Sequence, residues 1–180
     1  MTKLNRTAIT ALLTVTAVAG TVVATAAPAS ALSYRCNTST KSIDDPAYDG
    51  PWADNWDFKV TVCAARSGST VYTYSKVSWD GPVYGAVDDT GIFNAAYLRQ
   101  QVKKSVSGTD PVLKKTDFTA IEGKLENSDG NANYNGSYTT GTVSYRVGSA
   151  RGLGDAELKL EWANDGAGYK TYLFTASPVV

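Results

Sequence analysis

The chain of 180 residues carries 17 basic and 17 acidic side chains, two cysteines and no histidine. The balanced charge argues against nucleic-acid binding, which needs a dense basic stripe on the protein surface. The missing histidine excludes His-based catalytic triads, Cys–His dyads and zinc or copper sites with histidine ligands. No serine is followed by a lysine three positions later, so the Ser-x-x-Lys nucleophile motif is absent and the sequence argues against serine catalysis.

The first 31 residues have the pattern of an export signal. Two cations precede a run rich in Ala, Thr and Val, which ends at Pro28 and the small residues Ala29-Ser30-Ala31. This order predicts cleavage after Ala31. We therefore expect residues 1–31 to be removed as a secretory signal peptide, and residues 32–180 to form one secreted domain with no membrane anchor.

The two cysteines that remain after this cleavage are Cys36 and Cys63. In an exported protein such a pair predicts a disulfide bond rather than a redox site. The segment "DPAYDGPWADNWDF" at residues 45–58 lies between them. We therefore expect the disulfide to tie both ends of this segment to the fold.

Alternation of apolar and polar residues with a period of two predicts strands along most of the chain. Residues 90–108 also fit a helical face through Ala95, Leu98 and Val102, and we favour a strand. A turn at Ser67-Gly68-Ser69 predicts a hairpin. The predicted strands occupy residues 34–40, 55–65, 69–82, 90–108, 118–126, 138–147 and both halves of 155–177.

Short strands separated by Gly, Asn, Asp and Ser turns predict an all-β fold with a single antiparallel β-sandwich domain. A small β-barrel is the alternative. Trp56, Trp79 and Trp162 stand at alternating strand positions. We expect them in the core or in cross-strand contacts.

The four glutamates all stand in E-x-K-x-E patterns within predicted strands: Glu122, Glu126, Glu157 and Glu161. Opposite charges on one strand face are typical of a solvated surface, whereas a catalytic acid needs an apolar pocket. We therefore expect a protein that is not an enzyme, with a glycan-active enzyme as third possibility. The segment "ENSDGNAN" departs from calcium-loop spacing, so we expect neither metal nor cofactor, with a structural calcium as the weaker alternative.

The best candidate for a binding site is the Gly/Pro loop that holds Tyr48, Asp49, Trp52 and Asp54. No strand face is available there to bury Trp52. It is therefore either an exposed contact residue or a lid over one end of the core. As a contact residue it would anchor a partner, with the two aspartates beside it.

Charge is distributed unevenly along the chain. Residues 41–58 hold five aspartates and one lysine, whereas residues 99–115 hold five cations and one aspartate. Separate acidic and basic patches can steer a protein partner into place. We therefore expect an adaptor that engages another protein, with a carbohydrate-binding module as the alternative.

The Ala/Thr-rich signal, the size, the lone cysteine pair and the β-rich body make the chain resemble small secreted proteins of actinobacteria. Among these it is similar to the small adaptor subunit of the umbrella toxin particles, which joins a lectin-like subunit to a larger toxin chain. This resemblance implies a protein-binding adaptor. It assigns no role to any residue.

Overall fold

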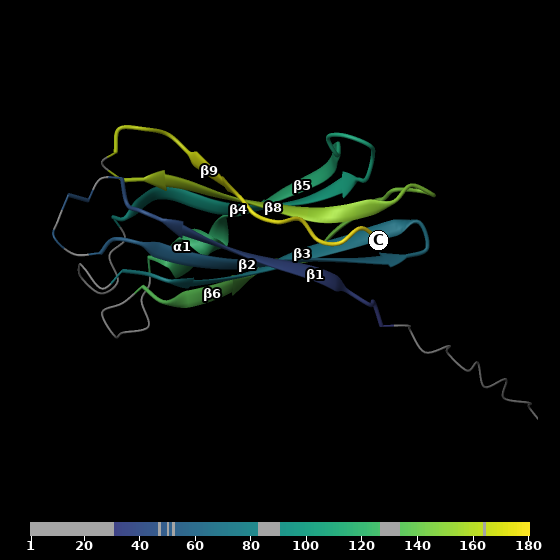
Figure 1. Cartoon of the computed structure of the whole chain (residues 1–180), viewed down its shortest axis with the longest axis horizontal. Helices are drawn as coiled ribbons and strands as arrows, with labels where there is room; N and C mark the ends of the chain where they lie inside the picture. Colours follow the sequence, from purple (N-terminus) through teal and green to yellow (C-terminus); the bar gives the residue numbers. More distant parts are fainter. Residues whose placement is uncertain are drawn as a thin grey trace, which may run out of the picture. The chain divides into compact units, whose positions relative to one another are not determined.

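The computed structural model describes residues 31–46, 48–49, 51, 53–82, 91–126, 134–163 and 165–180. Within these residues two antiparallel sheets pack face to face (Figure 1). The sheets do not close into a barrel, so the predicted β-sandwich is confirmed and the barrel alternative is wrong. Residues 1–30 lie outside the described part, and cleavage after Ala31 stays a prediction. In the described ranges no helix is long and apolar enough to cross a membrane.

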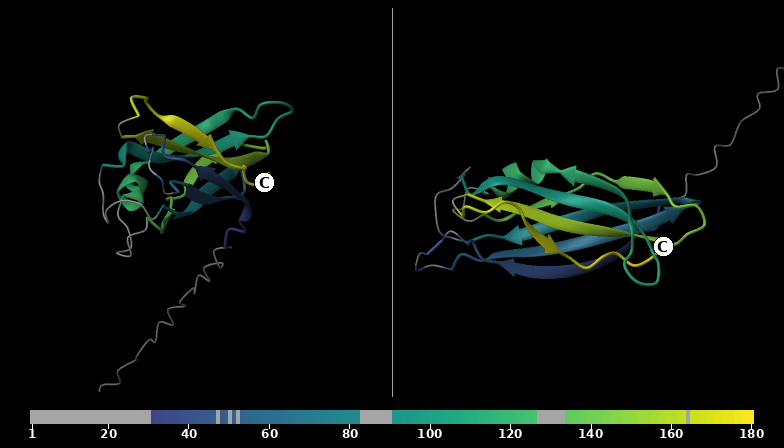
Figure 2. Two further views of the ribbon diagram at one scale, coloured as in Figure 1. Left: turned by 60° about the vertical axis from the view of Figure 1, so that its left-hand side comes forward. Right: turned by 90° about the horizontal axis from the view of Figure 1, so that it is seen from above.

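The strands divide between the two sheets as Figure 2 shows from two further directions. The first sheet contains β1 (Arg35–Ile43), β2 (Trp56–Ser67) and β3 (Thr70–Asp80), with β6 (Gly136–Thr139) and β7 (Val143–Arg146) both paired to β3. The second sheet has the order β5 (Val112–Phe118), β4 (Phe93–Lys104), β8 (Gly152–Trp162) and β9 (Lys170–Leu173). The predicted hairpin of β2 and β3 is confirmed, and its turn uses Gly68 at φ 54°, a conformation that glycine adopts freely.

Strand β4 resolves the ambiguity of residues 90–108. Leu98, Gln100 and Val102 are buried between the sheets, whereas Tyr97 and Arg99 are only half-buried on the outer face. β4 pairs with β5 along one edge and with β8 along the other. Hydrogen bonds along both edges stabilise the extended form of this segment over a helix. The predicted strand is therefore confirmed.

The predicted strand over residues 118–126 is wrong. The chain leaves β5 at Phe118 and forms a 3-10 turn η1 (Thr119–Ile121) followed by the short helix α1 (Glu122–Leu125). Glu122 Oε2 accepts a hydrogen bond from the backbone N–H of Ala96 at 3.1 Å, and Glu126 Oε1 accepts one from Phe93 at 3.2 Å. The two glutamates therefore satisfy N–H groups of β4 beyond the end of β5, and they do not form a solvated ladder.

Replacing Glu126 by alanine should lower the free energy of unfolding by about 1–3 kcal/mol, because a buried N–H loses its acceptor. Glu126 is only 5% exposed. Glu126→Gln keeps an acceptor oxygen and should cost less. Lys124→Ala, on the exposed side of the same helix, should change stability by less than about 0.5 kcal/mol. Urea titrations compare the three variants, and equal losses for Glu126→Ala and Lys124→Ala would contradict this role.

The main core is aromatic and lies around the start of β2 and the end of β8. Trp56, Trp79 and Trp162 are at most 4% exposed, which confirms their expected burial. A smaller cluster contains Val71 and Val102 with Val143. Apolar residues thus fill the sandwich at both ends.

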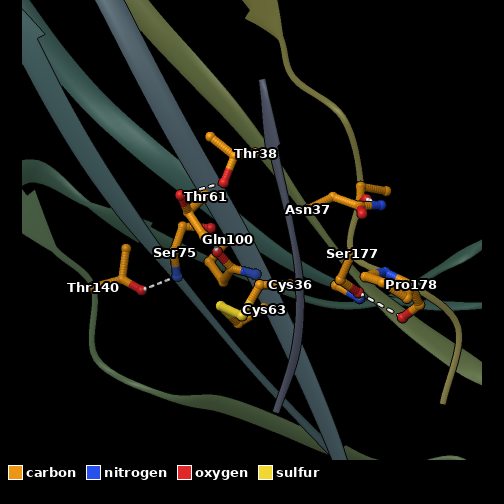
Figure 3. The surroundings of a disulfide bond; sticks show 12 residues. Cys36, Asn37, Thr38, Thr61, Cys63, Ser75, Gln100, Thr140, Ser177 and Pro178 are labelled. Atoms are coloured by element: carbon orange, nitrogen blue, oxygen red, sulfur yellow. Dashed lines mark hydrogen bonds between the residues drawn. A yellow bond between two sulfur atoms is a disulfide. The ribbon is translucent and has the colours of Figure 1, made fainter. Parts of the chain in front are cut away.

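Polar side chains occupy the middle of the sandwich, between the two apolar clusters. Ser75 Oγ donates to Gln100 Oε1, and the backbone N–H of Ser75 donates to Thr140 Oγ1 at 2.9 Å. Figure 3 shows this group near the disulfide. These hydrogen bonds tie the inner face of β3 to β4 and to the segment after β6, and so fix how the sheets are aligned.

The segment that follows β9 lies along the seam between β1 and the second sheet (Figure 1). Its last residue, Val180, exchanges two backbone hydrogen bonds with Gly152 of β8, at 2.8 and 3.1 Å. Asn37 of β1 donates from its side-chain amide to the carbonyl oxygen of Ala176 at 2.8 Å. This segment therefore connects the two sheets along one side of the sandwich.

Candidate functional site

The loop singled out from the sequence joins β1 to β2 at one end of the sandwich, on the left in Figure 1. Tyr48 is half-buried, and its backbone N–H donates to the carbonyl oxygen of Asp45 at 3.2 Å. Asp49 is exposed and Asp54 is half-buried. Trp52 lies outside the described residues, so the choice between contact residue and lid stays open.

The disulfide between Cys36 and Cys63 is confirmed. The two cysteines face each other across β1 and β2, with their Cα atoms 4.1 Å apart, and Figure 3 shows their surroundings. They are at the opposite end of this strand pair from the loop, which leaves at the pair Ile43 and Trp56. The expectation that the disulfide ties the loop to the fold is therefore wrong.

The loop is held by strand pairing and by one side chain at its base. The amide of Asn55 donates to Asp44 Oδ1 and to Ser42 Oγ, the latter at 3.2 Å. These bonds close the loop where it meets the strands. Polar contacts at the base thus present the acidic residues of the loop at the end of the sandwich.

Two aspartates extend the acidic surface onto the first sheet. Asp57 of β2 and Asp80 of β3 are directly opposite each other in the strand register, and both are exposed. Like charges at opposite positions repel and destabilise the strand pair. A hollow of about 350 Å³ lies beside them, lined by Ala53, Asn55, Asp57, Asp80, Gly81 and Pro82. We call the loop of residues 44–55 together with Asp57 and Asp80 the acidic end.

Sequence reasoning missed Asp80 as a member of this surface. It is 23 residues away from Asp57, and only the register of the β2–β3 hairpin brings the two together. Numbering the two strands outward from the predicted turn at residues 67–69 would have placed Asp57 opposite Asp80. Among the described residues, no group of three or more acidic or cysteine side chains is arranged to hold a metal ion.

The basic region predicted at residues 99–115 forms the second half of β4, the start of β5 and the connection between them. That connection lies at the other end of the sandwich from the acidic loop (Figure 1). The acidic and basic regions of the sequence therefore include loops at opposite ends of the sandwich.

The outer face of the second sheet carries a network of paired charges. Arg99 of β4 contacts both carboxylate oxygens of Asp117 in β5, at 2.7 and 2.8 Å. This hydrogen-bonded contact holds the pKa of Asp117 below its usual range and raises that of Arg99. In β8, Lys159 lies 3.5 Å from Glu157, as the expected opposite-charge ladder requires. These side chains neutralise one another and leave little free charge in the middle of the sheet.

Two tyrosines accompany this network. Tyr97 of β4 and Tyr169, in the β8–β9 connection, have ring centroids 5.1 Å apart and ring planes at 69°. The guanidinium of Arg99 lies 5.4 Å from the centroid of the Tyr97 ring. The rings therefore meet edge to face and do not form a flat platform.

Comparison with known proteins identifies no relative of the chain. No protein-family model matches it, and neither a curated protein nor a solved structure is significantly similar. The site must therefore be interpreted from its own geometry.

Proposed function

We propose that this chain is a secreted, non-enzymatic adaptor that binds another protein through the acidic end. The observation that supports this best is the directly opposed pair Asp57 and Asp80. A neighbouring cation would relieve their repulsion. The expected partner surface is therefore basic.

The loop adds contact residues to this charge. Tyr48 is half-buried and so offers part of an aromatic ring beside exposed Asp49. A protein interface commonly has an aromatic anchor at its centre and charged residues at its rim. In this proposal Tyr48 and Trp52 supply the anchor, and Asp49 and Asp54 belong to the rim.

Protein binding is better supported than carbohydrate binding. Sugar-binding sites stack sugar rings on exposed aromatic faces, but the Tyr97 ring already has Arg99 over its face and packs edge to face with Tyr169. The exposed aspartates of the acidic end suit ammonium and guanidinium groups, which neutral sugars lack.

The double substitution Asp57→Asn with Asp80→Asn should slow association with the partner about tenfold at low salt and have little effect at high salt, because charges at the rim mainly steer encounter. The partner is first isolated by pull-down from native culture supernatant, and binding is then followed by surface plasmon resonance. The melting temperature should stay unchanged or rise, since a repulsion is removed.

The control is Asp110→Asn with Asp155→Asn, which changes the net charge equally at the β4–β5 connection and near the start of β8, at the other end of the sandwich from the acidic loop. This control should leave association nearly unchanged. Trp52→Ala should speed dissociation without lowering the melting temperature if Trp52 is an anchor. Capture that survives both the double aspartate variant and Trp52→Ala would place the binding surface elsewhere.

A further inference from the structure

A hollow of about 380 Å³ lies where β4 meets β5, on the side of the second sheet away from the core. Its lining residues are Arg99, Gln101, Val112, Leu113, Lys114 and Lys115. The register of the two strands shifts here: Lys114 pairs with Val102 and Val112 with Lys103, which leaves Leu113 without a partner. Such bulges bend a strand and redirect its side chains, and they often occur beside binding sites. We call this hollow the β5 groove.

Gln101 lines the β5 groove with an unsatisfied acceptor. Its side chain belongs to the outer face of the sheet, yet the residue is only 3% exposed. The amide nitrogen donates to Glu157 Oε1 at 2.9 Å, which fixes the amide orientation because a carboxylate accepts only from a donor. The other atom, Oε1, is buried and has no hydrogen-bond partner within the described ranges. An orphaned acceptor of this kind costs free energy until a donor reaches it.

The cations that line the groove differ in what they already contact. Arg99 is engaged by Asp117. Lys114 and Lys115 are exposed, and in the part of the chain that the structure describes no carboxylate is within 4.0 Å of either ammonium group. Val112 beside them is 46% exposed. The groove thus combines two free positive charges, aliphatic surface and one buried acceptor.

We propose that the β5 groove binds a short acidic peptide segment of a partner protein. A backbone N–H of the peptide donates to Gln101 Oε1, its carboxylates pair with Lys114 and Lys115, and an aliphatic side chain packs on Val112. Charge complementarity favours a ligand with carboxylates, and the backbone N–H groups of an acidic peptide also supply the donor that Gln101 Oε1 lacks. This site is separate from the acidic end, and its test does not depend on binding there.

The probe is a fluorescein-labelled hexapeptide of four glutamates and two leucines, and binding to the folded chain is measured by fluorescence anisotropy at low salt. Lys114→Gln with Lys115→Gln should weaken binding about tenfold through the loss of two charge contacts. Gln101→Met keeps the side-chain length, removes the acceptor and should weaken binding about fivefold. A peptide with glutamine in place of each glutamate should not bind.

The matched control is Lys59→Gln with Lys76→Gln, which removes two exposed lysines from the outer face of the first sheet. This control and Asp57→Asn with Asp80→Asn should both leave peptide binding unchanged. Circular dichroism confirms that each variant is folded. If Gln101→Met does not fold, two other measurements test the proposal. Lys114→Gln with Lys115→Gln should still weaken peptide binding, and peptide addition should remove amide NMR signals only at residues 112–115.

Three results would each overturn the proposal. The first is failure of the glutamate peptide to bind. The second is an equal loss of binding in the two lysine pairs, which would indicate unspecific attraction between charges. The third is that polyglucuronate binds while the peptide does not, and that Lys114→Gln with Lys115→Gln weakens polyglucuronate binding. This result would assign the groove to an acidic polysaccharide.

Discussion

Replacing Trp56 by alanine should lower the free energy of unfolding by about 3–5 kcal/mol, because a large buried ring leaves a cavity that its neighbours cannot fill. Trp56 is fully buried. Its ring centroid lies 5.5 Å from those of Phe93 and Tyr134 and 6.4 Å from that of Trp162. Urea unfolding followed by far-ultraviolet circular dichroism measures the loss, since the tryptophan signal itself changes in the variant.

Tyr169→Ala serves as the control for an aromatic residue that is 45% exposed. It should cost far less than Trp56→Ala, because nearly half of the residue is already exposed to solvent. Similar losses for the two variants would mean that the aromatic cluster does not dominate the stability of the domain.

Removing the disulfide by Cys36→Ala with Cys63→Ala should cost about 3–4 kcal/mol in the chain-entropy description of cross-links. The two cysteines are 27 residues apart, so the bond substantially reduces the number of conformations open to the unfolded chain. Guanidinium unfolding of the oxidised wild type, the reduced wild type and the variant measures this effect. The reduced wild type and the variant should agree, and only the oxidised wild type should respond to a reducing agent.

An oxidised wild type no more stable than its reduced form would show that pairing of β1 with β2 alone holds these strands in place. This outcome is informative because the disulfide joins positions that nine register pairs of β1 and β2 already bring together. The measured difference therefore reports how much the cross-link adds to an existing strand pair.

Sequence patterns predicted the sandwich because most strands bury one face only. In β2, Trp56, Phe58 and Val60 alternate with exposed Asp57 and Lys59, which is direct evidence for a half-buried strand. The same reasoning was wrong for residues 118–126 for a geometric reason. Positions four apart share a face in a strand and nearly share one in a helix, so an E-x-K-x-E pattern does not distinguish the two forms.

The candidate site was predicted only in part. The acidic loop could be recognised from composition alone, because its aspartates are neighbours in sequence. The contribution of Asp80 depends on strand register, and the burial of Gln101 depends on side chains of β5 and β8 that surround it. Neither property is local in the sequence, so neither could be inferred before the strands were paired.

The segment that connects the two sheets also affects the order of folding. Asn37, near the start of the described chain, bonds to Ala176, which is 139 residues later. Contacts this distant in sequence close large loops and slow folding, and β-sandwiches are typically completed in milliseconds to seconds. During synthesis β1 therefore cannot make this contact until residue 176 has emerged, and its polar edge stays accessible to other chains in that interval.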